Sequence, residues 1–419
     1  MSATLKYESY KSSNSEWLGD IPSAWKTGVI GSLYTLRNTK VSDADYPPLS
    51  VTMKGIVPQL ETAAKTDAHD ARKLVLKGDF AINSRSDRRG SCGISDYDGS
   101  VSLINTVLTP RREMHPQYYN WLFHTVQFAD EYYKNGHGIV DDLWTTRWNE
   151  MKRILIPVPS LREQDGIADY LERKISHIDS VIAEAKASIE EYKAWKASVI
   201  YEAVTKGLDP DVEMKDSGND VIGQVPCAWD VCKYGVIASV ESNLVSPTLY
   251  PELIQISPDN IDKDSGKLLS CTTVEESGVI SNNHKFKKGQ ILYSKVRPSL
   301  NKVCIAPCDG LCSADMYPIE SSENTVFVKY MMLSHYFVEQ VSAVTANRVK
   351  MPKINQNELS QVTVVIPPVE IQDKICDYLD EKCSVIDSLI TEKESLIADL
   401  EAYKKSLIFE VVTGKRKVV

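Results

Sequence analysis

Two stretches of the chain resemble each other along their whole length. Residues 154–205 are ILIPVPSLREQDGIADYLERKISHIDSVIAEAKASIEEYKAWKASVIYEAVT, and residues 362–413 are VTVVIPPVEIQDKICDYLDEKCSVIDSLITEKESLIADLEAYKKSLIFEVVT. A shift of 208 positions superimposes them without a gap, so that Gln164 falls on Gln372 and Asp179 on Asp387. An internal repeat determines the architecture before any single motif is considered. The sequence therefore predicts one structural unit that is used twice.

Apolar residues recur in both stretches at alternating spacings of four and three. A seam that repeats every 3.5 residues over many turns is typical of a coiled coil. Pairing within the chain is favoured because one chain carries both copies, and a coiled coil between separate chains is the alternative. Lys196 and Lys404 fall on the seam, where a lysine costs stability but sets the register. The predicted helix-pairing residues are Leu171, Ile175, Ile178, Ile182, Ile189, Tyr192, Val199, Leu379, Ile386, Ile390, Ile397, Leu400 and Leu407.

A shorter motif opens each half of the chain. It is WLGDIPSAW at residues 17–25 and VIGQVPCAW at residues 221–229, and a Gly-, Pro- and acid-rich linker precedes the second copy. Between each motif and its helix, short apolar runs bounded by Gly, Asp and Asn indicate strands, and residues 115–133 and 325–343 carry helical spacing. We predict an α+β protein with an internal pseudo-twofold repeat. Two mixed α/β domains, at residues 1–158 and 208–366, are joined by long antiparallel coiled-coil helices at residues 159–207 and 367–419.

The composition is that of an ordinary soluble protein. Hydrophobic residues make up 42% of the chain and charged residues 25%, and no apolar run is long enough to span a membrane. The first residues contain no apolar core of the kind found in signal peptides. Nine cysteines, an odd number, indicate reduced thiols. We therefore expect a cytoplasmic protein with no membrane partner.

The charge balance conceals local basic clusters. A net charge of −9 argues against a nucleic-acid partner, but residues 1–155 hold 19 Lys and Arg against 18 Asp and Glu. Lys and Arg neutralise phosphates, and Arg also binds the edge of guanine. Any one cluster is equally well explained as a solvated loop, but clusters in both domains favour DNA. The candidate DNA-binding residues are Arg85, Arg88, Arg89, Arg111, Arg112, Lys285, Lys287, Lys288, Lys295, Arg297, Lys302, Arg348, Lys350 and Lys353.

Catalytic signatures are missing from the sequence. It has no Gly-rich phosphate loop and no HExxH motif, and Tyr46-Pro47-Pro48 has the wrong order for the target-base loop of a methyltransferase. Glu213 and Lys215 have the spacing of a nuclease metal site, but their neighbouring Pro-Asp is too close to span a pair of strands. We expect no catalytic residue in this chain.

Cys304, Cys308 and Cys312 are spaced four residues apart, which raises the possibility of a metal site. Structural zinc usually draws on closely spaced cysteine pairs, and Pro307 and Asp309-Gly310 place a turn within this run. We therefore predict that these cysteines lie in flanking strands as small buried apolar groups, with no metal.

These motifs, in this order and each present twice, resemble the specificity subunit of type I restriction–modification enzymes over essentially the whole chain. The second copy departs from the family pattern at Ile371, where an acidic residue is preferred, and at Gln290, where Asp is preferred. The residues that carry the resemblance are Ile156-Pro-Val-Pro159, Glu163-Gln164, Tyr170-Leu171, Ile178-Asp179, the Gly-x-Ile-Pro-x-x-Trp opening, Lys77-Gly78-Asp79 and Tyr97-Asp98-Gly99, with Ile366-Pro-Pro368, Gln372, Tyr378-Leu379 and Ile386-Asp387 in the second copy.

The resemblance implies two target recognition domains, each reading one half of a bipartite, asymmetric site in double-stranded DNA. The long helices would set the distance between the halves and bind two modification (methyltransferase) subunits, which restriction subunits (translocase and nuclease) would join. S-adenosylmethionine, ATP and Mg²⁺ would be used by those partners, and this subunit would be non-catalytic with no cofactor. The alternatives are the recognition subunit of a different split restriction system, a coiled-coil scaffold that does not bind DNA, and an enzyme with an unrecognised site.

Overall fold

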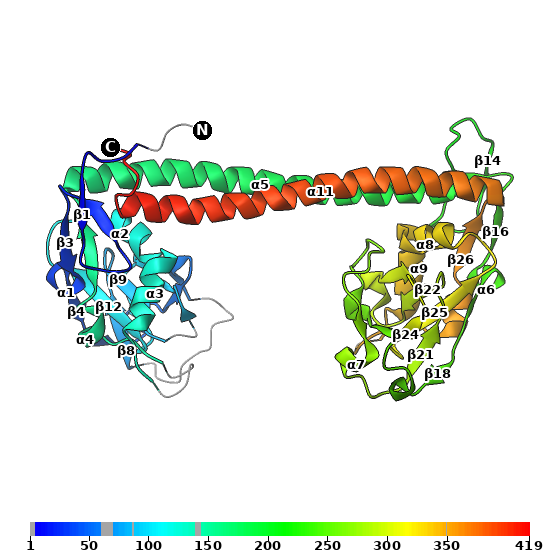
Figure 1. The fold of residues 1–419 in the computed structure, drawn as a ribbon, viewed down its shortest axis with the longest axis horizontal. Coiled ribbons are helices and arrows are strands. Elements are labelled where there is room, and N and C mark those ends of the chain that lie inside the picture. The colour runs from blue at the N-terminus through cyan, green and yellow to red at the C-terminus, as the bar shows by residue number, and fades with distance from the viewer. Residues whose placement is uncertain (1–4, 60–69, 86–87, 139–143, 349) are drawn as a thin grey trace. The chain divides into compact units, whose positions relative to one another are not determined.

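The computed structural model describes residues 5–59, 70–85, 88–138, 144–348 and 350–419. The chain divides into two compact units, of which the first comprises Met1–Ala185 with Glu394–Val419 and the second comprises Lys186–Lys393. Two long helices, α5 (Leu161–Lys206) and α11 (Val369–Val412), each contribute to both units (Figure 1). Each unit therefore contains one mixed α/β domain together with part of each long helix.

The domain of the first unit is built on a four-stranded antiparallel sheet in the order β10-β9-β12-β4, beside a three-stranded sheet in the order β11-β8-β5. The short strand pairs β1-β2, β6-β7 and β13-β3 complete it. The strands are β1 (Tyr10–Ser12), β2 (Asp20–Pro22), β3 (Lys26–Val29), β4 (Tyr34–Arg37), β5 (Lys40–Val41), β6 (Leu49–Thr52), β7 (Gly55–Pro58), β8 (Arg72–Val75), β9 (Phe80–Asn83), β10 (Cys92–Ile94), β11 (Gly99–Val101), β12 (Asn105–Pro110) and β13 (Leu155–Val158). The short helices are α1 (Ile30–Leu33), α2 (Pro116–Phe123), α3 (Val126–Lys134) and α4 (Trp148–Met151).

Aromatic side chains fill the core between the central sheet and helices α2 and α3. The ring centroids of Phe80 and Phe123 are 4.4 Å apart, and those of Phe123 and Phe128 are 4.8 Å apart. Thr125 caps α3 by accepting a hydrogen bond from the Phe128 N–H at 3.2 Å. Because β9 is covered on both faces, all four of its residues are buried, Asn83 together with the apolar Phe80, Ala81 and Ile82.

The second unit repeats this topology. Its central sheet has the order β17-β25-β22-β23, which matches β4-β12-β9-β10, and its β18-β21-β24 matches β5-β8-β11. This second sheet is extended by β19, parallel to β24, and by β20. The strands are β14 (Met214–Asp216), β15 (Gln224–Pro226), β16 (Asp230–Lys233), β17 (Ala238–Val240), β18 (Leu244–Val245), β19 (Ile254–Ile256), β20 (Thr272–Thr273), β21 (Asn283–Phe286), β22 (Ile291–Ser294), β23 (Val303–Ile305), β24 (Gly310–Cys312), β25 (Met316–Ser321) and β26 (Thr363–Ile366). The shorter helices are α6 (Tyr234–Ile237), η3 (Pro247–Leu249), η4 (Pro258–Asn260), α7 (Val274–Ser277), η5 (Pro298–Leu300), α8 (Thr325–Leu333), α9 (His335–Thr345) and α10 (Gln356–Ser360).

Matching turns lead into the central strands β9 and β22. Asp79 accepts a hydrogen bond from the Leu76 N–H at 2.9 Å, and Gln290 accepts one from the Lys287 N–H at 2.9 Å. Gly78, just before Asp79, and Gly289, just before Gln290, have φ angles of +88° and +87°, a conformation that favours glycine. Gln290 therefore makes the same main-chain hydrogen bond as Asp79, although it departs from the family's preferred residue.

The long helices pack against each other within each unit, and the predicted antiparallel pair is confirmed. In the first unit Asp179 of α5 accepts from Lys404 of α11 at 2.6 Å. In the second unit Lys196 of α5 donates to Asp387 of α11 at 2.8 Å. The two ion pairs are related by the repeat shift of 208 positions, with the roles of the helices exchanged. The seam lysines thus pair with aspartates of the facing helix.

Burial varies along the predicted seam. Ile390, Ile397 and Leu400 are only half-buried, as are Tyr192 and Val199. The seam residues that are fully buried are Leu171, Ile175, Ile178, Ile182, Ile189, Leu379, Ile386 and Leu407. Within the parts of the chain that are described, no helix combines the length and the apolarity that a membrane crossing requires.

The opening motifs close the ends of the long helices. A Cβ on Gly207, just after α5, would lie 3.0 Å from Trp229, and one on Gly414, just after α11, would lie 3.1 Å from Trp25. Both glycines have left-handed backbone, with φ angles of +79° and +74°. The first motif therefore packs against the end of α11 in the first unit. The C-terminal segment also bonds there to the N-terminal one, where Lys417 N–H donates to Leu5 O at 2.8 Å.

Candidate nucleic-acid interface

Each domain brings two distant segments together where its central strand ends. In the first unit Arg85, after β9, forms an isolated bridge with Thr145. In the second unit Val296, after β22, forms the equivalent bridge with Lys353. A further main-chain hydrogen bond follows each bridge, from Ile354 N–H to Lys295 O at 3.0 Å and from Thr146 N–H to Ser84 O at 3.0 Å. We call these segments the tip loops: residues 84–85, 88–90 and 144–147 in the first unit, and residues 295–302, 348 and 350–355 in the second.

The predicted basic residues form five clusters along the sequence, and the tip loops contain the three that begin at Arg85, Lys295 and Arg348. The other two lie at the opposite end of the central sheet. Arg111 and Arg112 follow β12, which is antiparallel to β9, and Lys287 and Lys288 precede β22. Arg111 is also engaged within the fold, since its Nε donates to Tyr34 O at 2.8 Å. The structure therefore places the predicted clusters at two separate ends of each domain.

Several basic side chains of the second unit hold its tip loops in place. Lys353 pairs with Asp315 at 2.7 Å, and Lys302 donates to Pro258 O at 2.7 Å. Arg348 donates to Lys353 O.

The other predicted basic residues of the second unit differ in their surroundings. Arg348 also pairs with Glu358. Lys295 lies 5.2 Å from the centroid of the Tyr317 ring, and burial lowers its pKa. Arg297 and Lys350 are exposed and have no side-chain partner among the described residues. These two remain available for an external anion. Lys285, outside the tip loops, lies 4.6 Å over the Tyr250 ring.

In the tip loops of the first unit, too, some basic side chains are held by the fold and others are exposed. Arg89 pairs with Asp130 and lies 5.9 Å from the centroid of the Tyr133 ring. The main-chain oxygen of Arg88 accepts from the Tyr133 hydroxyl at 3.3 Å. Arg85 is exposed, and its main-chain N–H donates to Asn83 Oδ1 at 3.0 Å, which fixes the start of the loop.

Left-handed backbone at bulky residues is a feature that the sequence did not signal. Arg297 and Asn301 have φ angles of +49° and +44°, and Met351 has one of +48°. All three lie in the tip loops of the second unit. Non-glycine residues rarely adopt this conformation, and such strain concentrates at binding sites.

Two buried glutamines join each domain to its long helix. Gln164 accepts from the His115 N–H and donates to Pro159 O, both at 2.9 Å. Gln372 makes the matching bonds with the Asn324 N–H at 3.0 Å and with Pro367 O at 2.9 Å. Sequence reasoning did not assign this role, although the identity of the two positions across the repeat was the available signal.

The residues considered for metal binding or nuclease chemistry lie in strands and turns, where their contacts are with the rest of the fold. Cys304 and Cys312 are buried in β23 and β24, where burial raises the pKa of both thiols to about 12. The prediction was wrong for Cys308, which is exposed because it lies in the turn between these strands. Lys215 donates to the main-chain oxygens of Cys227 at 2.9 Å and Trp229 at 2.7 Å, and so supports the β14-β15 pair. No group of three or more His, Cys, Asp or Glu placed to hold a metal occurs within the described ranges.

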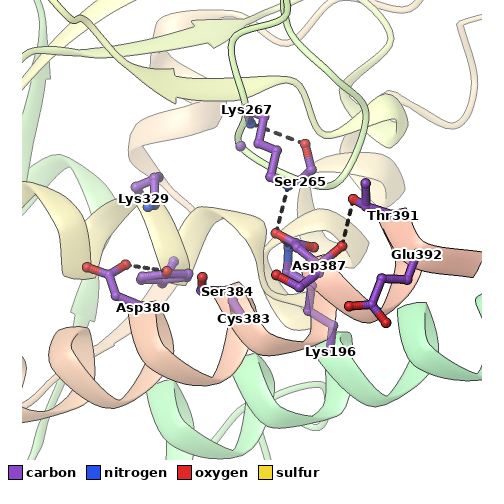
Figure 2. A pocket seen from close by; sticks show the side chains of 13 residues that line it. Lys196, Ser265, Lys267, Lys329, Asp380, Cys383, Ser384, Asp387, Thr391 and Glu392 are labelled. Atoms are coloured by element: carbon purple, nitrogen blue, oxygen red, sulfur yellow. Dashed lines mark hydrogen bonds and ion pairs between the residues drawn. The ribbon is translucent and has the colours of Figure 1, made fainter. Parts of the chain in front are cut away.

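A cavity of about 570 Å³ lies in the second unit between α5, α8, α11 and residues 265–267 (Figure 2). Asp387 on its wall accepts from Lys196 at 2.8 Å and pairs with Lys267 at 2.9 Å. Burial by itself would raise the pKa of Asp387, but the two lysines outweigh it and hold that pKa below its usual value. One carboxylate therefore ties a loop of the domain and both long helices together, whereas Asp179 in the first unit pairs only with Lys404 among the described residues.

Both domains present a matched pair of tip loops, with exposed cations, at the same end of a matched central sheet. The family model described as "Type I restriction modification DNA specificity domain" matches residues 252–398. The chain is therefore similar to the specificity subunits of type I restriction–modification systems, and residues 252–398 match their DNA specificity domain.

Relatives by sequence extend over most of the chain. The type I restriction enzyme EcoDI specificity subunit of Escherichia coli is 27% identical over 420 residues, which cover 95% of this chain and 90% of that one. The type I restriction enzyme MjaVIII specificity subunit of Methanocaldococcus jannaschii is 25% identical over 318 residues, covering 71% of this chain and 70% of that one.

Solved structures share the fold. A chain from the work described as "Structural basis underlying complex assembly and conformational transition of the type I R-M system" aligns with a TM-score of 0.71 and 14% identity, over 94% of this chain and 98% of that one. The HsdS subunit from Thermoanaerobacter tengcongensis aligns over the same shares with a TM-score of 0.52 and 16% identity. The fold of this chain, with mixed α/β domains and a pair of long helices, is therefore one that solved structures also have, among them an HsdS subunit.

Proposed function

We propose that this specificity subunit reads a bipartite, asymmetric site in double-stranded DNA, with one half-site bound by each domain. The observation that carries the proposal is the tip-loop pair, which recurs at the same place in both topologically matched domains. The exposed cations differ, with Arg85 in the first unit and Arg297 with Lys350 in the second. Different side chains on the same scaffold favour different base sequences, so the two half-sites should differ.

We further propose that the long helices bind two modification subunits, which restriction subunits then join. The repeat places Trp195 and Tyr403 at equivalent positions, and their exposed fractions are 48% and 45%. Exposed aromatic residues on an otherwise polar helix are frequent anchors of protein interfaces. Two such anchors related by the repeat suit two copies of one partner.

In this proposal the chain is non-catalytic and acts in the cytoplasm, where the DNA lies. S-adenosylmethionine, ATP and Mg²⁺ are used by the partner subunits. The purified chain alone should show no methyl transfer, cleavage or ATP hydrolysis, and methyl transfer should begin when modification subunits are added. Turnover by the chain in a host that lacks the partner genes would contradict this.

Half-site independence is the direct test of the proposed recognition. In the assembled methyltransferase, Arg85→Ala should change the preference or affinity at one half-site only, and Arg297→Ala at the other. A lost base contact should cost about 1–3 kcal/mol, while a lost phosphate contact should reduce the salt slope by about one. Arg112→Ala, at the opposite end of the first domain's sheet, is the control. Methylated positions are mapped by sequencing, and relaxation at both half-sites in either variant would overturn the proposal. Binding without dependence on salt or sequence would favour a scaffold that does not read DNA.

A further inference from the structure

Left-handed backbone at non-glycine residues is unevenly distributed in this chain. Of the five such residues that are described, three lie in the tip loops of the second unit: Arg297, Asn301 and Met351. Asn tolerates this conformation because its short side chain hydrogen-bonds locally, but Arg and Met have no such compensation. The free-energy cost at Met351 must therefore be met by contacts around it.

The contacts that impose this conformation flank Met351. On its C-terminal side, Pro352 O accepts from the Arg297 N–H at 2.7 Å, and Lys353 is held by Asp315 at 2.7 Å. On its N-terminal side, Arg348 is fixed by Glu358 and by Lys353 O. Met351 thus lies between two residues, Arg348 and Pro352, that are held by the rest of the fold.

The side chain that this loop presents is apolar and exposed. Met351 is 53% exposed and lies beside Lys350, with Arg297 on the bridged segment. A loop whose only task is phosphate binding gains nothing from a strained apolar residue between two cations. Apolar side chains on DNA-binding loops contact thymine methyl groups or insert between base steps.

We propose that Met351 is a specificity-determining residue that makes an apolar contact with bases of the half-site bound by the second domain. Lys350 and Arg297 hold the adjacent DNA backbone or base edge while the thioether reaches the bases. This inference rests on the proposed function, since it assumes that the domain reads DNA.

The test uses the chain assembled with its modification subunits, and measures dissociation constants at two salt concentrations. The DNA is the cognate duplex and a panel with single base-pair changes. Met351→Ala and Met351→Gly should both weaken cognate binding roughly tenfold and lose preference at one or two adjacent positions of that half-site. The other half-site and the salt slope should be unchanged. Met351→Leu should retain most of the preference, because it keeps an apolar side chain of similar volume.

Two comparisons separate this role from others. Lys350→Ala should weaken binding to all sequences and lower the salt slope by about one, as expected of a phosphate contact. Ile280→Ala removes an apolar side chain that is 86% exposed elsewhere in the same domain, and it should leave the dissociation constants and the base preference unchanged. Replacing thymine with uracil in the affected positions then distinguishes a methyl contact from insertion at a base step. Either of these supports the proposal.

Several results would overturn it. If Met351→Ala and Met351→Gly both bind as the parent does, the side chain makes no base contact. If Met351→Ala loses preference but Met351→Gly keeps it, only the backbone conformation matters, because glycine relieves the strain. Preserved preference at the first half-site shows that each variant is folded. A parent assembly without sequence preference would instead contradict the proposed function itself.

Discussion

Gln164 and Gln372 each lie on a long helix, and the buried side-chain amide of each binds two other segments of the same unit. One is the loop before a short helix of the domain, and the other is the proline-containing segment that leads into the long helix. Gln372 is fully buried, and its loss would leave the Asn324 N–H and the Pro367 carbonyl without a partner. We expect Gln372→Ala to lower the free energy of unfolding of the second unit by about 2 kcal/mol, because a buried unsatisfied group costs about 1–3 kcal/mol. Urea unfolding measures this, with the exposed Gln361→Ala as the control. Equal stability of the two variants would show that water replaces the amide.

A residue-scale role of this kind is only partly predictable from sequence. The repeat singled out the two glutamines, but each binds one main-chain atom five positions away and another 48 or 49 positions away, and no pattern in the sequence points to the distant one. The same holds for Arg89, Arg348 and Lys353, whose pairing with acidic residues became visible only in the fold. Composition identified clusters of cations, whereas tertiary contacts decide which of them remain free.

At the scale of elements, Asp387 connects α5, α11 and the loop that carries Lys267. Its side chain is 19% exposed, whereas that of Asp179 in the repeat-related pair is 52% exposed. We expect Asp387→Asn to cost roughly 2 kcal/mol of stability at neutral pH, since hydrogen bonds to charged groups contribute about 1.5–3 kcal/mol. Asp179→Asn should cost under about 1 kcal/mol, as exposed ion pairs do. Similar losses in both variants would contradict this difference.

The Asp387 contribution should also depend on pH. Its pKa is lower in the folded than in the unfolded chain, because Lys196 and Lys267 outweigh the opposing effect of burial. The stabilisation is therefore present above the unfolded pKa of about 4 and is lost as the pH falls through the folded value. The difference in unfolding free energy between the parent and Asp387→Asn should shrink below about pH 4. A difference that persists well below that pH would mean that the carboxylate charge is not responsible.

The long helices were predictable because their signal is periodic and occurs twice. The heptad placed them at residues 159–207 and 367–419, and the structure has them at Leu161–Lys206 and Val369–Val412. The tip loops were not predictable, because each joins segments that are far apart in sequence and share no period. For Cys308 the sequence correctly predicted a turn at Pro307 and Asp309-Gly310, but that turn, between β23 and β24, includes Cys308, which was predicted to lie in a flanking strand.

At the scale of the whole molecule, the helices should set the spacer between the two half-sites. We consider four residues inserted after Ala185 in α5 and four after Lys393 in α11, where the two units meet along the chain. Each ion pair within a unit keeps its partner, while each helix lengthens by one turn, or roughly 6 Å. The preferred spacer should increase by one or two base pairs, at about 3.4 Å per pair, with both half-sites unchanged.

Two-residue insertions at the same places are the control for this experiment. They rotate the helices by about 200° and break the seam, so binding should be lost. Sequencing of methylated DNA reports the spacer in each case. An unchanged spacer after the four-residue insertions would show that the helices do not determine it.

The bonds made by Gln164 and Gln372 also bear on how such a protein changes over generations. Gln164 holds its domain through main-chain atoms alone, and Gln372 does so through main-chain atoms together with the Glu323 carboxylate at 2.7 Å, so these bonds place little demand on the side chains at the contact. A domain of different sequence that enters and leaves the frame with the same backbone path would be held equally well. If each domain reads one half-site as proposed, genetic exchange of the segment between the opening motif and the long helix would replace one half of the recognised site in a single event, while the frame would be inherited unaltered.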